Sequence, residues 1–208
     1  MNVPILPELV TRVVSCNFDH YSDSNLNDLV RELCTEMNVC DSQIRALEQA
    51  TIKQSETALW KEHRVGRITA SNFGRVQKWM TNSGSNPNAD PSKLVQALLH
   101  PLQHPTAAMK HGISCEYYAK EEYLSIQKVN HSRFEVRDSG LIIFKDAPYI
   151  GASPDLRVTC VCHDEGLCEI KCPFKIKGEQ PSYQNLDYIK LKGHIEELDK
   201  NSNYYFQI

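Results

Sequence analysis

The sequence lacks any apolar run of the roughly 18 residues that a membrane-spanning helix needs. Its opening segment, MNVPILPELV, lacks the basic start and the long apolar stretch of a secretory signal. It also lacks internal repeats. We therefore expect an intracellular protein, in the nucleus or the cytoplasm, that is not secreted and has no membrane partner.

A strong excess of charge is also absent, since the formal net charge is only −3. This argues mildly against a general nucleic-acid binder, because Lys and Arg supply most of the non-specific affinity for phosphates. The net charge of the whole chain does not show where basic residues cluster, however. Carboxylates gathered around a metal would lower the sum and leave a basic groove intact elsewhere. Nucleic-acid binding is therefore not excluded.

Hydrophobic residues make up 41% of the 208 positions, which is enough for one substantial domain with a true core. Apolar residues at helical spacing follow Asp23 and Asp41, and they predict a helix after each of these positions. A third predicted helix carries Leu59 and Trp60. The N-terminal part of the chain is thus expected to be helical.

The composition of the sequence changes after about residue 80. Asn, Ser, Gly and Pro dominate residues 81–92 and predict a surface loop. Helices are expected over about residues 93–99 and 107–127. Short β-type runs fill residues 134–174, a last helix is predicted over 186–198, and the tail NYYFQI indicates one more strand. This order predicts an α/β fold with a central mixed β-sheet flanked by helices.

A pair of acidic residues and a lysine form the most informative pattern. In CEIKCPF, the strand period of two places Glu169 and Lys171 on one face. Asp155 ends the segment SPD, and residues 156–168 have the length of a strand, a turn and a return strand, so Asp155 and Glu169 are predicted to meet. Short motifs of this kind more often mark a turn and a solvated face. Their order, together with a suitable acid upstream, reverses that preference.

The upstream acid is Glu116, which shares a helical face with Gly112, Ala119 and Tyr123. A glutamate on a helix is usually just solvated, but these small and aromatic neighbours indicate a face that packs inward. A buried carboxylate needs a partner such as a metal. Carboxylates on neighbouring elements suit Mg²⁺, and an ammonium such as that of Lys171 helps to position or deprotonate an attacking water. The residues therefore predict a phosphodiester hydrolase.

Several motifs follow Trp60 in a fixed order: RVGRITASNFG, HGISCEYYAKEEY, IGASPD, CEIKCPF and YYFQI. In this order they resemble the YqaJ-type viral recombinase and phage lambda exonuclease family, a branch of the PD-(D/E)XK nuclease superfamily. The resemblance covers about residues 54–208, and departs from the usual pattern at Leu156, where a glycine is common. It implies a restriction-endonuclease-like core preceded by N-terminal helices.

The resemblance also implies roles for individual residues. Asp155 and Glu169 would be metal ligands, Lys171 the catalytic lysine, Glu116 the helix acid near the metal, and Ile170 a ligand through its backbone carbonyl. Two Mg²⁺ ions are the implied full complement, with Mn²⁺ as a substitute.

The resemblance further implies a pocket for a 5′ phosphate, formed by Arg64, Ser71 and Ser153. A guanidinium and hydroxyl donors near a helix N-terminus suit a terminal phosphate. On the residues alone, Arg64 and Arg67 would instead be a basic patch at a helix end, and Ser71 a helix cap. Trp60 is interpreted as a core anchor rather than a base-stacking platform.

The implied activity is that of a metal-dependent DNA nuclease, a 5′-to-3′ exonuclease on linear double-stranded DNA that acts in recombination or DNA processing. The implied partners are a single-strand annealing protein and further copies of the chain. An endonuclease and a catalytically inactive DNA-binding module are alternatives. We expect the nuclease domain over residues 51–208, truncated at its C-terminus, and a helical extension of unassigned role over residues 1–50.

Eight cysteines are present, and reduced thiols are expected in an intracellular chain. Four thiols close in sequence suggest a rival hypothesis, a zinc-stabilised interaction domain; these are Cys160, Cys162, Cys168 and Cys172, with His163 nearby. The spacing C-x-C followed by C-x3-C is not that of a usual zinc knuckle pair. Reduced thiols without zinc are therefore the preferred interpretation.

Overall fold

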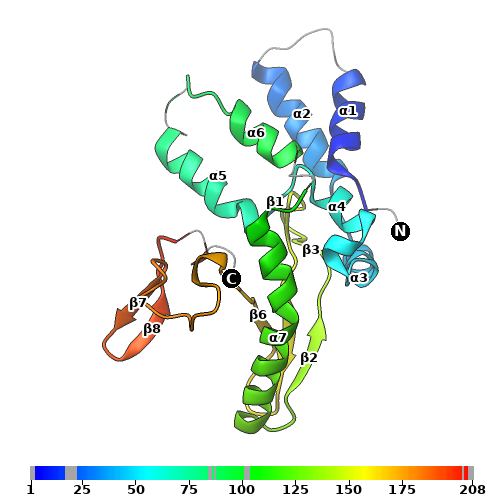
Figure 1. Ribbon diagram of the computed structural model, residues 1–208. Helices are drawn as coiled ribbons and strands as arrows, with labels where there is room; N and C mark the ends of the chain where they lie inside the picture. Colours follow the sequence, from blue (N-terminus) through cyan, green and yellow to red (C-terminus); the bar gives the residue numbers. More distant parts are fainter. Residues whose placement is uncertain are drawn as a thin grey trace. The chain divides into compact units, whose positions relative to one another are not determined.

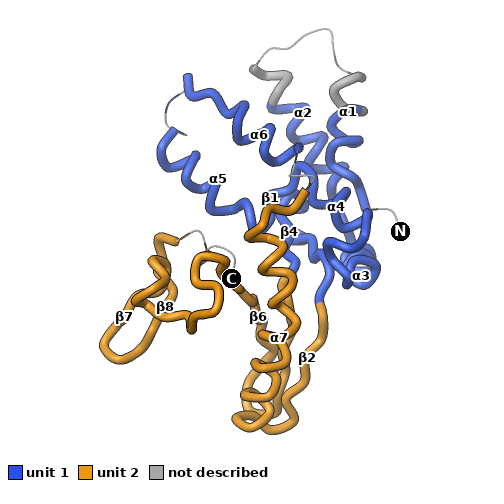
Figure 2. Tube along the Cα trace, viewed as in Figure 1, with its two compact units in different colours: residues 1–101, 139–153 blue, residues 102–138, 154–208 orange. Residues whose placement is uncertain are grey.

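The computed structural model describes residues 3–16, 23–83, 86, 88–100, 104–202, 204 and 205. Figure 1 labels the helices and strands, and the chain divides into two compact units, which Figure 2 colours separately. Unit 1 comprises residues 1–101 and 139–153, and unit 2 comprises residues 102–138 and 154–208. Helices and small sheets occur together, so the mixed α/β class is confirmed. Over the described ranges, no helix combines the length and apolar character needed to cross a membrane.

Unit 1 is mainly helical. Its helices are α1 (Leu6–Cys16), α2 (Asp23–Glu36), α3 (Asp41–Ala50), α4 (Ala58–Arg64), α5 (Ala70–Ser83) and α6 (Ser92–Leu99), with a 3-10 turn at Gln54–Glu56. The predicted helices after Asp23 and Asp41, and the one with Leu59 and Trp60, are confirmed. The predicted loop over 81–92 is wrong at its start, because α5 continues through Ser83; residues 84, 85 and 87 lie outside the described residues.

A three-stranded sheet completes unit 1, with β1 (Ile68–Thr69), β3 (Ile142–Ile143) and β4 (Ile150–Ala152). The order is β1-β4-β3, in which β1 runs parallel and β3 antiparallel to β4. Leu47, Leu141 and Ile143 are almost fully buried in one core cluster, and Trp60 packs against it. The predicted role of Trp60 as a core anchor agrees with this packing, which also fixes α4.

The described residues of unit 2 form one long helix and two antiparallel sheets. Its elements are α7 (Ala107–Asn130), β2 (Glu135–Asp138), β5 (Leu156–Thr159), β6 (Gly166–Cys168), a 3-10 turn at Phe174–Ile176, β7 (Ile189–Lys192) and β8 (Ile195–Leu198). The strand orders are β2-β5-β6 and β7-β8. The face of α7 that was predicted to pack inward is half-buried, while the neighbouring Tyr117 and Tyr118 are exposed.

Within the described part of the chain, the strands therefore form three small sheets rather than one central sheet, and local chemistry explains the breaks. Pro154 has no N–H to donate and separates β4 from β5. Between β2 and β3, the N–H of Leu141 donates to the hydroxyl of Thr51, 2.8 Å away, instead of to a strand. Gly140 is required there, because a Cβ would lie 2.0 Å from the Glu48 carbonyl oxygen.

The predicted helix over residues 186–198 is wrong. The segment forms the β7-β8 hairpin, in which Lys192 pairs with Ile195 across a two-residue turn. Gly193 has a φ of 65°, which a glycine adopts without strain and which ends any helical path. Lys190 and Glu197 lie opposite each other, and opposite charges stabilise such a pair. The predicted last strand falls largely on residues 203 and 206–208, which lie outside the described residues.

Candidate active site

The β5-β6 hairpin brings two carboxylates together. Leu156 pairs with Cys168, so Asp155, just before β5, and Glu169, just after β6, lie at the same end of the hairpin. The backbone N–H of Ile170 donates to Asp155 Oδ2 at 2.6 Å and fixes that carboxyl group. This is the meeting of Asp155 and Glu169 that the spacing of the two motifs predicted.

Helix α7 adds Glu116 and a residue that the sequence did not single out. The Nζ atom of Lys120 lies 2.9 Å from Glu116 Oε1 and 3.8 Å from Asp138 Oδ1, on β2. Lys120 follows Glu116 by four residues, the spacing that places two side chains on one helical face. The pairing of Lys120 with Glu116 could therefore have been predicted from the sequence. The contact of Lys120 with Asp138 could not, because it depends on how α7 packs on the β2-β5-β6 sheet.

Electrostatics tie these groups into one cluster. Burial raises the pKa of Asp155 to about 6, and the negative charges of Glu169 and Glu116 add to the rise; the Ile170 hydrogen bond and the Lys171 charge oppose it. Burial lowers the pKa of Lys120, but its hydrogen bond to Glu116 and the surrounding carboxylates outweigh this and leave the pKa raised. The cluster therefore holds more negative charge than its lysines balance.

Lys171 lies at the rim of the cluster and forms an ion pair with Glu169. Its side chain is 36% exposed, against 18% for Glu169. β6 ends at Cys168, so the predicted strand through Glu169 and Lys171 is shorter than expected. The ion pair shows that the two side chains still share one face. The ammonium can thus meet a solvent-borne substrate while the carboxylate stays inside.

A pocket of about 350 Å³ lies beside Glu169 and Lys171. The hairpin β7-β8 supplies much of its lining, together with Tyr188 and Tyr204, whose ring centroids are 4.4 Å apart. Burial, then the neighbouring Tyr204 and Asp187, raise the pKa of Tyr188 to about 12, so its hydroxyl stays protonated. The pocket thus combines an aromatic wall with the two charged groups of the site.

Unit 1 holds the three residues expected to bind a phosphate, arranged around Trp60. Arg64 Nη2 donates to Ser71 Oγ at 2.9 Å, and its guanidinium lies 4.1 Å from the centroid of the Trp60 ring. Trp60 Nε1 donates to Ser153 Oγ, also at 2.9 Å. The hydroxyls of Thr69 and Ser71 are 3.1 Å apart. Arg64, Ser71 and Ser153 therefore belong to one polar cluster, which we call the Arg64 cluster.

Arg67 does not join a basic surface patch, which corrects one interpretation of the sequence. Its side chain is fully buried, and it donates to the carbonyl oxygens of Pro4, His63 and Pro148 at 2.6 to 3.0 Å. Burial lowers its pKa to about 10, so it keeps its charge at neutral pH. Arg67 is thus a structural residue that fixes the backbone between α4 and β1.

His63 is buried in α4 next to Arg64, and burial, then the charge of Arg67, lowers its pKa from 6.5 to about 4. Between these two pH values the unfolded chain binds a proton that the folded chain does not, so acidification favours unfolding. We expect the free energy of unfolding to fall by up to about 3 kcal/mol as pH drops through this window. In His63→Leu this pH-dependent decrease in the free energy of unfolding should be absent. Urea titrations at several pH values would measure it. The exposed His104→Ala is the control, and an unchanged pH profile in His63→Leu would contradict this assignment.

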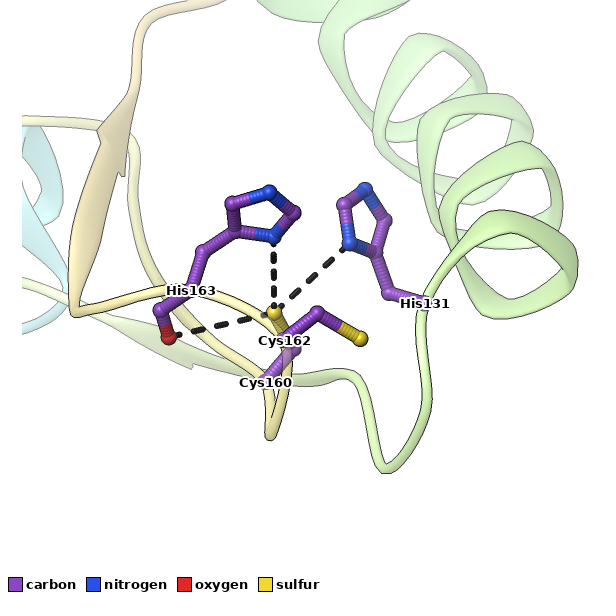
Figure 3. A group of neighbouring side chains, drawn as sticks. All are labelled: His131, Cys160, Cys162 and His163. Atoms are coloured by element: carbon purple, nitrogen blue, oxygen red, sulfur yellow. Dashed lines mark hydrogen bonds between the residues drawn. The ribbon is translucent and has the colours of Figure 1, made fainter.

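The cysteines do not group as the sequence suggested. His131, Cys160, Cys162 and His163 place one ligand atom each within 4.8 Å of one another (Figure 3). Among the described residues, Cys168 and Cys172 are not part of this group. Cys168 interacts instead with Tyr123 and Asp155. His131, 29 residues before Cys160, carried no sequence signal that linked it to the thiols.

Several solved structures are similar to this chain. An alkaline exonuclease from Laribacter hongkongensis is 34% identical, over 57% of this chain and 54% of its own, with a TM-score of 0.40. A SOX-DNA complex is 23% identical over 72% and 28%, with a TM-score of 0.45. The Shutoff and Exonuclease Protein of Kaposi's sarcoma-associated herpesvirus is 21% identical over 72% and 30%, with a TM-score of 0.41.

The chain thus spans little more than half of the first of these structures and less than a third of the other two. No curated protein matches it. The model of the YqaJ-like viral recombinase domain matches residues 59–208, which include the carboxylate cluster of Glu116, Asp155 and Glu169, together with Lys171 and the Arg64 cluster. The chain therefore belongs to the YqaJ-like viral recombinase domain family.

Proposed function

We propose that this chain is a metal-dependent DNA nuclease, and that it degrades linear double-stranded DNA from the 5′ end. The observation that carries the proposal is the convergence of Glu116, Asp155 and Glu169 with Lys171 at the rim. The pKa of Asp155, raised by burial and further by the charges of Glu169 and Glu116, supports it, because a buried carboxylate beside other carboxylates calls for a cation. Family membership supports the nuclease class.

The donor set fits a hard divalent cation. Glu116, Asp155 and Glu169 offer oxygen atoms, which Mg²⁺ prefers, and Mn²⁺ accepts the same ligands. The backbone carbonyl of Ile170 is the fourth proposed ligand, next to the N–H that fixes Asp155. When bound, Mg²⁺ supplies Lewis-acid stabilisation of phosphate charge and a more acidic water. Two ions are the proposed full complement.

The chain's own groups have distinct tasks in phosphodiester hydrolysis. Lys171 Nζ donates to the attacking water or to a non-bridging phosphate oxygen, where its charge stabilises the negative charge that develops. Glu169 holds this ammonium in place through their ion pair. Lys120 neutralises part of the charge of Glu116 and Asp138 and limits their repulsion with Asp155. The aromatic pocket beside Lys171 is large enough to take a nucleoside group.

The Arg64 cluster is the proposed site for the 5′ phosphate. A guanidinium with adjacent hydroxyl donors makes strong, charge-assisted hydrogen bonds to phosphate oxygens. Ser153, which belongs to this cluster, is only two residues from the proposed metal ligand Asp155 in the chain. A pocket that holds the terminal phosphate would make cleavage depend on a DNA end. This end dependence is what distinguishes the proposed exonuclease from an endonuclease.

The proposed function is tested with three DNA substrates and Mg²⁺. Linear duplex with a 5′ phosphate should be degraded, a closed circle should survive, and removal of Mg²⁺ should stop the reaction. Nicking of the circle would favour an endonuclease. Binding of linear duplex without any cleavage in Mg²⁺ or Mn²⁺ would indicate a catalytically inactive DNA-binding module.

Arg64→Ala should remove the preference for a 5′ phosphate over a 5′ hydroxyl. We expect the rate on the phosphorylated duplex to fall about 10- to 100-fold, because one or two charge-assisted hydrogen bonds are lost. The rate on the hydroxyl-ended duplex should change little. The exposed Arg75→Ala on α5 is the matched control for a lost positive charge. Equal losses on both substrates would exclude Arg64 from 5′-phosphate recognition.

A further inference from the structure

A second group of potential metal ligands lies in unit 2, outside the carboxylate cluster. His131 directly follows the last residue of α7, and Cys160 directly follows β5. Cys162 and His163 lie in the turn that leads to β6. Figure 3 shows a ring nitrogen of each histidine directed toward the Cys160 sulfur, with the Cys162 thiol beside it. Residues from two separate chain segments thus converge at one end of α7.

Two of the distances between ligand atoms match those of a tetrahedral metal site. Cys160 Sγ lies 3.6 Å from Nδ1 of His131 and 3.6 Å from Nδ1 of His163. Zinc in proteins has bonds of about 2.3 Å to sulfur and about 2.0–2.1 Å to nitrogen, so two such ligands at a tetrahedral angle are about 3.6 Å apart. The four ligand atoms, all within 4.8 Å of one another, can therefore reach one ion with little movement.

Backbone contacts hold the two chain segments together. The Val161 N–H donates to the Ser132 carbonyl oxygen at 3.0 Å, and the Ser132 N–H donates to Cys162 Sγ at 3.4 Å. The His131 ring also packs against Phe134, with centroids 5.7 Å apart. Groups that hydrogen-bond and orient the ligands in this way are typical of metal sites. The ligand geometry is thus pre-arranged by neighbouring residues.

The chemistry of these donors differs from that of the carboxylate cluster. Two thiolates and two imidazoles are softer ligands, which select zinc and disfavour Mg²⁺. Two thiolates also balance the charge of Zn²⁺. Both cysteines are free thiols in the structure, so both sulfur atoms are available as ligands.

We propose that His131, Cys160, Cys162 and His163 form a structural zinc site. With four protein ligands the site is closed, so the ion has no open position for a substrate. The zinc joins the end of α7 to the β5-β6 turn. Helix α7 carries Glu116, and the β5-β6 hairpin carries Asp155 and Glu169 at its other end. The site therefore stabilises the frame of the carboxylate cluster without contacting it, and it does not depend on the proposed nuclease activity.

Metal content is the first test. The untagged chain, supplied with one equivalent of Zn²⁺ and passed through a desalting column in excess Mg²⁺, should retain about one zinc per chain. The double variant Cys160→Ser/Cys162→Ser should retain none. Cys34→Ser, which removes an exposed cysteine of α2, should retain as much as the unchanged chain. No retained zinc in the unchanged chain, or equal zinc in the double variant, would overturn the proposal.

Cobalt spectroscopy identifies the ligands even if the double variant does not fold. With Co²⁺ the chain should show thiolate-to-cobalt charge-transfer absorption and tetrahedral bands. His131→Cys adds a third thiolate, and the charge-transfer absorption should rise by about half, because it scales with the number of sulfur ligands. Cys34→Ser should leave the spectrum unchanged. A spectrum without thiolate bands, or one that His131→Cys does not alter, would contradict the assignment.

Discussion

Lys171→Ala should lower Mg²⁺-dependent cleavage of linear DNA by about 10³-fold, while the protein remains folded. Loss of a single group that stabilises charge or moves a proton in the transition state has effects of about this size. The Lys171 side chain lies at the rim, and its ion-pair partner Glu169 keeps some contact with solvent, so the loss of this pair should cost little stability. Its loss should therefore reduce the rate much more than the stability. Initial rates and thermal melting of the same preparation measure both.

Two further variants show whether this effect belongs to the site. Asp155→Ala should also abolish cleavage, because it removes a proposed metal ligand. Lys175→Ala, an exposed lysine in the 3-10 turn after the site, should leave the rate unchanged. Zinc content should be the same in all three proteins, so a failed nuclease assignment would not affect the zinc proposal. Activity that persisted in both Lys171→Ala and Asp155→Ala would remove the proposed active site.

The sequence could predict the parts of the site that depend on local geometry. The length of the segment 156–168 predicted a hairpin. A hairpin places Asp155 and Glu169 at the same end, independently of the rest of the structure. Helical spacing similarly placed Glu116 on the inward face of α7. These predictions needed only the periods of helix and strand. Whether the residues have the catalytic roles that the family resemblance implies stays a prediction.

The features that the sequence did not predict depend on tertiary contacts or, for residues 186–198, on the turn at Gly193. Asp138 meets Lys120, and His131 meets Cys160, only because α7 and the β2-β5-β6 sheet pack together. The residues 186–198 contain apolar positions that suit a helix as well as a hairpin. The turn at Gly193 decided the outcome, and a single glycine is tolerated within predicted helices.

Arg67 is predicted to contribute strongly to the stability of unit 1. Its guanidinium satisfies three carbonyl oxygens in a site without measurable solvent exposure. Arg67→Ala leaves these acceptors unpaired and creates a cavity. Each unpaired buried polar group costs about 1–3 kcal/mol, and breaking a buried charged network about 3–5 kcal/mol. We expect the free energy of unfolding to fall by about 3–5 kcal/mol, measured by urea denaturation.

The conservative variant Arg67→Lys should recover only part of this stability. An ammonium keeps the charge but lacks the planar set of donors that reaches the carbonyls of Pro4, His63 and Pro148 together. Arg45→Ala, which removes an exposed arginine of α3, should change the stability by less than about 0.5 kcal/mol. Because Arg67 fixes the backbone next to Arg64, Arg67→Lys should also weaken the preference for a 5′ phosphate. If Arg67→Ala melted at the same temperature as Arg45→Ala, the buried guanidinium would not be what holds α4 and β1 in place.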